Sequence, residues 1–216
     1  MIEEIISKSY LKRLDNIVQW LERDTFNRES VSQHSFKVAV FTRVLLDDIF
    51  GDTQDFRVER FKMNCVTHAI FHDFDEAIFL RDVSHNVKYN EFNGNDVRKS
   101  IDDFVEHEFN KEFAKESESE KPAYDTLKSA IIDVDPDVKK VVKVADWLAL
   151  LYYCRRELAL GNKNFELTYK YCVDGAIRAT YNMCKMIEFI FNISTANVES
   201  NINKIMKSSV YGETDY

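Results

Sequence analysis

Residues 66–76 read Val-Thr-His-Ala-Ile-Phe-His-Asp-Phe-Asp-Glu, an apolar run that ends in a cluster of polar side chains. The first half has the spacing of a buried helix, and the second half places His72 and Asp73 side by side with Glu76 close behind. Residues three or four positions apart share a helix face, so we expect the Glu76 carboxylate to project beside the pair. Adjacent His and Asp ligands of one metal ion need the local geometry that a helix end supplies. The stretch therefore predicts a helix that ends at a candidate divalent-metal site.

The same helical spacing recurs along nearly the whole chain of 216 residues, which contains only 5 glycines and 2 prolines. Alternation typical of strands is nearly absent. These features predict an all-α fold, a single domain over residues 1–216 built from about eight helices. We expect helices at about 2–23, 30–50, 54–72, 76–80, 96–114, 123–132, 137–160 and 164–192, with a weaker helical tail. Residues 84–95 and 115–122 are typical of polar connectors.

His34 lies in the first turn of the second predicted helix. Ser30 and Gln33 have the spacing of a capping box, which would begin the helix directly before the histidine. His34 shares a helix face with Val38 and Leu45, so its imidazole is expected to point into the core. Two interpretations stay open from these residues alone: a metal ligand, or a core histidine hydrogen-bonded to the backbone.

Asp146 lies within the apolar stretch of residues 141–151. Burying an ionised carboxylate there is costly unless a cation or several hydrogen-bond donors compensate its charge. The alternative is an exposed stripe that Asp146 shares with Lys139 and Lys143, with Lys143 close enough in sequence to form a surface ion pair. The apolar neighbours favour a buried Asp146 carboxylate whose charge is compensated by a cation or by hydrogen-bond donors.

The overall charge and the cysteines restrict the class of protein. A formal net charge of -8 disfavours non-specific binding to nucleic acid, although a bound cation would still permit a phosphate-bearing small molecule. The four cysteines are far apart with no Cys-x-x-Cys pair, as in reduced cytoplasmic proteins. Neither a signal peptide nor a stretch long enough to cross a bilayer is visible. We therefore expect a cytoplasmic protein with no nucleic-acid or membrane partner.

Four segments together resemble a known family: residues 29–35, 71–76, 87–89 and 142–146. In this order and nearly this spacing they resemble the HD-domain phosphohydrolases, and more closely the YfbR-like 5′-deoxynucleotidases. The resemblance covers about residues 14–160, and residues 164–216 would form a helical C-terminal extension. It implies one divalent ion (Mn, Co, Mg or Zn) held by His34, His72, Asp73 and Asp146.

The resemblance also implies roles for residues around this ion. Glu76 matches the acid that orients the attacking water or takes its proton, and Asp82 looks like the second site acid, although one extra residue separates it from Glu76. Lys88 matches a loop lysine that meets the substrate phosphate. Trp20 matches a tryptophan that packs on the sugar and disfavours a 2′-hydroxyl, although an ordinary packing role for it stays open.

One position departs from the family pattern. Gln19 stands where the deoxynucleotidases have an arginine that orients the phosphate. Arg23, Arg28, Arg81 and Lys88 are candidates to replace it, and the sequence does not choose among them. Related phage-type HD enzymes remove triphosphate from dATP, and a changed phosphate site would suit that activity.

The expected function is hydrolysis of a deoxynucleoside monophosphate, with a dATP-type triphosphohydrolase as the main alternative. A two-metal phosphodiesterase would need His85 and His107, and a non-catalytic helical scaffold would keep the metal for structure only. A zinc-protease site at His68 and His72 is disfavoured because Ala69 replaces the required glutamate. The late helices carry more apolar residues than one buried face needs, which favours a homodimer. These residues are Tyr181, Met183, Ile187, Phe189, Ile190 and Phe191.

Overall fold

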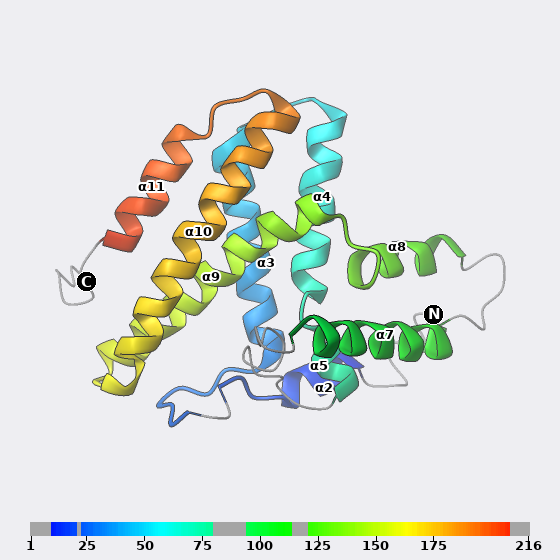
Figure 1. Cartoon of the computed structure of the whole chain (residues 1–216), viewed down its shortest axis with the longest axis horizontal. Coiled ribbons are helices and arrows are strands. Elements are labelled where there is room, and N and C mark those ends of the chain that lie inside the picture. Colours follow the sequence, from blue (N-terminus) through cyan, green and yellow to red (C-terminus); the bar gives the residue numbers. More distant parts are fainter. Residues whose placement is uncertain (1–9, 21–22, 80–93, 114–120, 208–216) are drawn as a thin grey trace. The chain divides into compact units, whose positions relative to one another are not determined.

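The computed structural model describes residues 10–20, 23–79, 94–113 and 121–207 (Figure 1). Helices are the regular elements of these ranges, so the predicted all-α fold is confirmed. They are α2 (Tyr10–Asn16), α3 (Val31–Phe50), α4 (Phe56–Phe71), α5 (Phe74–Phe79), α7 (Gly94–Phe113), α8 (Lys121–Ile131), α9 (Pro136–Ala159), the short 3-10 helix η1 (Lys163–Phe165), α10 (Glu166–Phe191) and α11 (Ala196–Lys207).

The chain divides into two compact units. Unit 1 consists of Met1–Arg23, Arg28–Ser35 and Phe71–Asp135. Its core brings α2, α5, α7 and the start of α3 together, because apolar side chains from all four are buried against one another. These side chains are Leu14, Ile17, Val31, Phe74, Ala77 and Phe109. Predicted residues Asp82, His85 and Lys88 lie outside the described part of the chain.

The first predicted helix, at about 2–23, is wrong for its last described residues, because α2 ends at Asn16. Ile17 and Gln19 instead pair with residues 29–31, where α3 begins: the Val31 amide donates to the Ile17 carbonyl at 2.9 Å, and the Gln19 amide donates to the Glu29 carbonyl at 2.8 Å. This pairing satisfies backbone groups that a longer helix would have satisfied internally. The chain then turns at Trp20, whose φ of 64° is unusual for a bulky residue.

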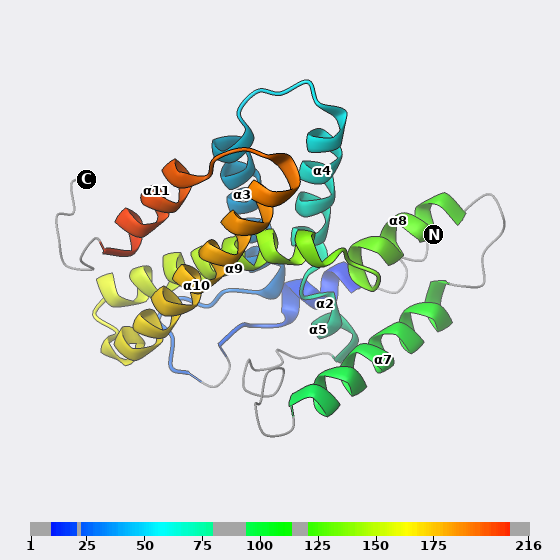
Figure 2. The ribbon, with the colours of Figure 1, turned by 45° about the horizontal axis from the view of Figure 1, so that its top comes forward.

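Unit 2 consists of Asp24–Asn27, Phe36–Ile70 and Pro136–Tyr216. Figure 2 shows α3 and α4 as neighbouring antiparallel helices and α9 beside α10. The approach of α9 to α10 depends on Gly175, since a Cβ atom there would lie 2.6 Å from the ring of Trp147. Glycine is therefore required where the tryptophan ring packs on the α10 backbone.

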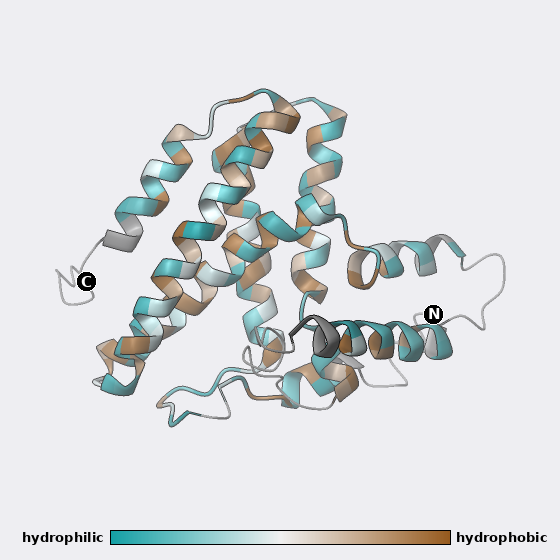
Figure 3. Ribbon diagram, viewed as in Figure 1, coloured by the Kyte–Doolittle hydropathy of each residue, from teal (hydrophilic) through white to brown (hydrophobic). Residues whose placement is uncertain are grey.

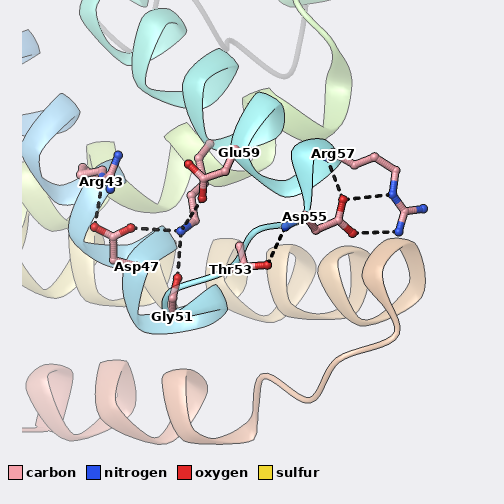
Figure 4. Close-up of polar contacts among 8 residues, drawn as sticks. Arg43, Asp47, Gly51, Thr53, Asp55, Arg57 and Glu59 are labelled. Carbon is pink, nitrogen blue, oxygen red and sulfur yellow. Dashed lines mark hydrogen bonds and ion pairs between the residues drawn. The ribbon is translucent and has the colours of Figure 1, made fainter.

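The turn between α3 and α4 is held by a buried lysine. The Lys62 ammonium lies 3.2 Å from Asp47 Oδ1, 3.1 Å from the Gly51 carbonyl oxygen and 3.3 Å from Glu59 Oε1. Figure 4 shows Arg43 on the other side of the Asp47 carboxylate, and this arginine lowers the pKa of Asp47 by hydrogen bonding to it. Asp55, in the same view, begins α4 by accepting a hydrogen bond from the Arg57 amide at 2.8 Å.

The late helices bury only part of their apolar residues. Bands of apolar and polar residues alternate along α10 in Figure 3. Met183 and Ile187 are buried, whereas Tyr181, Ile190 and Phe189 are exposed, the last by 90%. Among the described residues, no helix combines the length and the apolar character needed to cross a membrane.

Candidate metal centre

His34 is placed by the capping box predicted from the sequence. The Ser30 amide donates to Gln33 Oε1 at 3.0 Å, and the Gln33 amide donates to Ser30 Oγ at 3.3 Å. This reciprocal pair begins α3 and puts His34 in its first turn, where the side chain is only 2% exposed. The expectation that the imidazole points inward is therefore confirmed.

A carboxylate lies beside one nitrogen of this imidazole. Glu29 Oε1 is 3.7 Å from His34 Nδ1, and both side chains are buried. Histidines that bind metals commonly have an acid or a carbonyl next to the ring nitrogen that does not bind the ion, which orients the ring. Glu29 thus leaves Nε2 as the candidate ligand atom of His34. The sequence contained this residue in the motif of residues 29–35, but no local spacing marked it as a partner of the histidine.

His72 and Asp73 form the short connection between α4 and α5, as expected for paired ligands at a helix end. His72 Nε2 and Asp73 Oδ2 are 3.2 Å apart, and the His72 ring lies next to that of His34 with a centroid separation of 5.4 Å. Metal–ligand bonds of about 2.1 Å place neighbouring ligand atoms roughly 3 Å apart. The spacing of the two side chains therefore fits a shared ion.

Gln19 contacts this pair, which the sequence did not reveal. Its Nε2 donates to Asp73 Oδ2 at 3.4 Å, a long hydrogen bond, while its backbone is fixed by the pairing with Glu29. The side chain is buried. Gln19 therefore helps to orient the Asp73 carboxylate, a role that a neutral amide fills without adding a charge near the cation site.

Glu76 lies in the first turn of α5 and is 2% exposed. Its amide donates to the Asp73 carbonyl at 3.1 Å, so the two residues are joined by one tight turn. A carboxylate buried this close to candidate metal ligands is typical of a group that handles protons rather than of a solvated surface acid.

Asp146 lies in the middle of α9, in unit 2, and its side chain is 13% exposed. Val144, Ala145 and Trp147 around it are buried, as the apolar stretch predicted. Lys143 Nζ is 2.8 Å from Asp146 Oδ2, so the predicted lysine pair is also present, in a partly buried rather than a fully exposed setting. His34, His72 and Asp146 are candidate metal ligands by their donor atoms. Two imidazoles with carboxylates suit Mn²⁺, Co²⁺, Zn²⁺ or Mg²⁺.

The other histidines and the predicted tryptophan are also described. His107 is 73% exposed on α7 beside Glu108, which agrees with a solvated helix face. His68 is buried within α4. Trp20 is partly buried at the turn after Gln19. Its position fits either of the two roles considered from the sequence.

Comparison with known proteins decides the family. The family model described as 5′-deoxynucleotidase YfbR-like matches residues 8–196. The chain belongs to the YfbR-like family. The match includes parts of both units and the positions of all four predicted ligands, and it confirms the resemblance to the YfbR-like family.

Solved structures agree with the YfbR-like fold. An HD-domain phosphohydrolase from Listeria innocua has a TM-score of 0.58 at 15% identity, with 95% of this chain and 98% of that chain covered. The PH0347 protein from Pyrococcus horikoshii OT3 has a TM-score of 0.57 at 23% identity, with 93% and 99% covered. A search of curated proteins found no match. The chain therefore shares its fold with an HD-domain phosphohydrolase.

Proposed function

We propose that this protein is a 5′-deoxynucleotidase, which hydrolyses a deoxynucleoside monophosphate to the deoxynucleoside and orthophosphate. The observation that carries the proposal is the proximity of the buried His34 to the partly buried pair His72 and Asp73, with the buried Glu76 one turn away, in a chain matched by the YfbR-like family. Asp146 is proposed as the fourth ligand of the ion. Its support is the chemistry of the donor set and the family match across both units.

The bound divalent ion would supply a Lewis acid for the phosphoryl group and a water of lowered pKa. Glu76 orients the attacking water and accepts its proton as the new P–O bond forms and the bond from phosphorus to the 5′-oxygen breaks. The leaving 5′-oxygen takes up a proton from solvent water and departs as the sugar hydroxyl. Glu29 and Gln19 hold His34 and Asp73 in the orientations that ligation requires. Trp20 is proposed to pack on the sugar, and Asp82 and Lys88 to contact the substrate.

The test is product identification with dNMPs, dNTPs and the matching ribonucleotides, each with Mn²⁺, Co²⁺ and Mg²⁺. Orthophosphate released from dNMPs, and little from the ribonucleotides, is the expected result. The Glu76→Gln variant should lose turnover while it retains metal binding and thermal stability. No release of phosphate or polyphosphate from any substrate would refute the proposal, and unchanged turnover in Glu76→Gln would refute the role of this acid.

A dNTP triphosphohydrolase is the second candidate, and Gln19 is the observation that favours it. The glutamine amide is engaged with Asp73 and carries no positive charge for a monophosphate. The same assay separates the two activities, because triphosphate rather than orthophosphate would then appear from dATP. A metal-to-protein ratio near two would instead favour the phosphodiesterase alternative, and metal without turnover would favour the scaffold.

A further inference from the structure

Lys143 is held in place by two neighbours on its own helix. Its ammonium lies 2.8 Å from Asp146 Oδ2 and 4.9 Å from the centroid of the Trp147 ring. The lysine side chain is 37% exposed, whereas the Asp146 side chain is largely buried. A cation over the face of a tryptophan is attracted by the electrons of the ring. The ammonium therefore has a defined position beside a candidate metal ligand.

The tryptophan ring itself is fixed by α10. Trp147 packs directly on Gly175, with no room for a Cβ atom there, and its ring meets that of Tyr171 edge to face at 5.6 Å. A ring held from one side by backbone and from another by an aromatic neighbour has little freedom to turn. The Trp147 ring under the Lys143 side chain is thus rigid, although the ammonium at the end of the lysine can exchange its anionic partner.

Binding of a cation to Asp146 would change the electrostatic environment of the Lys143 ammonium. The ammonium neutralises the Asp146 carboxylate in the free protein, and a divalent ion on the same carboxylate would repel it. The ammonium then requires a new anion close to where it already lies. A phosphate that binds the same ion would be that anion, and an ammonium is a common phosphate partner in proteins.

We propose that Lys143 is a phosphate-binding residue. Its ammonium pairs with Asp146 in the free protein and pairs instead with the substrate phosphate when metal and substrate bind. The proposal rests on the proposed function, since it assumes that Asp146 holds the ion. It assigns the positive charge that Gln19 does not provide, and it makes Lys143 a determinant of binding for phosphorylated substrates over the unphosphorylated nucleoside.

The test compares Lys143→Met with Lys140→Met in the full chain. Lys140 is a matched control because its Nζ lies 2.8 Å from Asp137 Oδ1 on the same helix, with the same i, i+3 spacing. Mn²⁺ affinity is measured by calorimetry without substrate. The affinities for inorganic phosphate and dAMP are then measured on the Mn²⁺-loaded protein, with each variant carrying Glu76→Gln as well so that dAMP is not hydrolysed.

Lys143→Met should bind Mn²⁺ as tightly as the wild type or more tightly, because a competing cation has been removed. It should bind phosphate and dAMP about 10- to 100-fold more weakly, as expected for the loss of one charge-assisted hydrogen bond. Lys143→Arg should restore most of the phosphate affinity, and Lys140→Met should change neither quantity. Lys143→Gln repeats the measurement if the methionine variant does not fold.

Two results would overturn the assignment. Weaker Mn²⁺ binding in Lys143→Met would show that the lysine only positions Asp146, and unchanged phosphate affinity would show that it does not meet the substrate. Both are distinct from failure of the proposed function, in which the wild type itself would release no phosphate from deoxynucleotides.

Discussion

Replacement of Glu157 by glutamine tests how the segment Asp24–Asn27 is held in unit 2. Glu157 is 0% exposed. Its Oε1 accepts a hydrogen bond from the Asn27 amide at 2.8 Å, and its Oε2 accepts from the Phe26 amide at 2.8 Å and from Asn162 Nδ2 at 2.7 Å. Asn162 also donates to the Asp24 carbonyl, and the Tyr153 hydroxyl donates to the Asn27 carbonyl. The carboxylate is the centre of this network.

Glutamine has nearly the same shape but replaces one acceptor oxygen with an NH₂ donor. In the less costly orientation, Nε2 replaces Oε1, so the Asn27 amide loses its acceptor and the two bonds at the other oxygen lose their charge. A hydrogen bond to a charged group contributes about 1.5–3 kcal/mol, and a buried donor left unsatisfied costs about 1–3 kcal/mol. Because the Asp24 and Tyr153 bonds remain, we expect Glu157→Gln to lower the free energy of unfolding by roughly 2–4 kcal/mol.

Urea unfolding followed by circular dichroism measures this loss directly, with Asp48→Asn as the control because Asp48 is an exposed acid of the same unit. Limited trypsin digestion gives a second readout, since Arg23 and Arg28 flank the held segment and are exposed. Cleavage there should accelerate in Glu157→Gln and not in the control. A loss below about 1 kcal/mol, the size of one ordinary hydrogen bond, together with unchanged cleavage, would refute the view that this carboxylate holds the segment.

Three further predictions concern stability. Gly175→Ala should destabilise the protein by about 1–3 kcal/mol in thermal unfolding. The steric cost of placing a Cβ atom against the fixed Trp147 ring exceeds the gain of roughly 1 kcal/mol in helix propensity. Adding Trp147→Leu should restore part of the lost stability. Lys62→Met should cost about 1–2 kcal/mol in urea unfolding, less than for a fully buried ion pair, because the acids around it are partly exposed. Arg43 lowers the pKa of Asp47 in the folded state, so the ionised carboxylate makes a small contribution to the free energy of unfolding above the unfolded pKa of 3.8. This contribution is lost as the pH falls further. In parallel pH titrations of stability, Asp47→Asn should therefore decline less below pH 4 than the wild type.

The parts of the fold that the sequence predicted well are those governed by local interactions. The capping box of Ser30 and Gln33 lies within one helical turn, and its geometry sets both the start of α3 and the inward direction of His34. The connection between α4 and α5 is equally local, because the helical run ends at Phe71 and leaves His72 and Asp73 between two helices. In both places a few neighbouring residues contain all the interactions that matter.

The parts that the sequence did not predict depend on residues far apart in the chain. Residues 17–20 have helical spacing, but pairing of Ile17 and Gln19 with residues 29–31 competes with the helix and displaces it. The contact of Gln19 with Asp73 spans 54 residues, and no periodicity or motif connects the two. Long-range pairing of this kind overrides local propensity, so the helical spacing of residues 17–20 does not locate the end of α2.

The two acids of α9 show why burial alone does not identify a functional carboxylate. Asp146 and Glu157 are eleven residues apart and share one face of the helix. Glu157 is the more deeply buried, yet its oxygens are saturated by backbone and amide donors that belong to the fold and cannot leave without unfolding the segment Asp24–Asn27. One partner of Asp146 is instead the end of a partly exposed lysine side chain. A charge compensated by a movable group can exchange that group for an ion, whereas a charge compensated by the backbone cannot. Of the two acids, Asp146 is therefore the one suited to bind a metal, and Glu157 is the one suited to hold the structure.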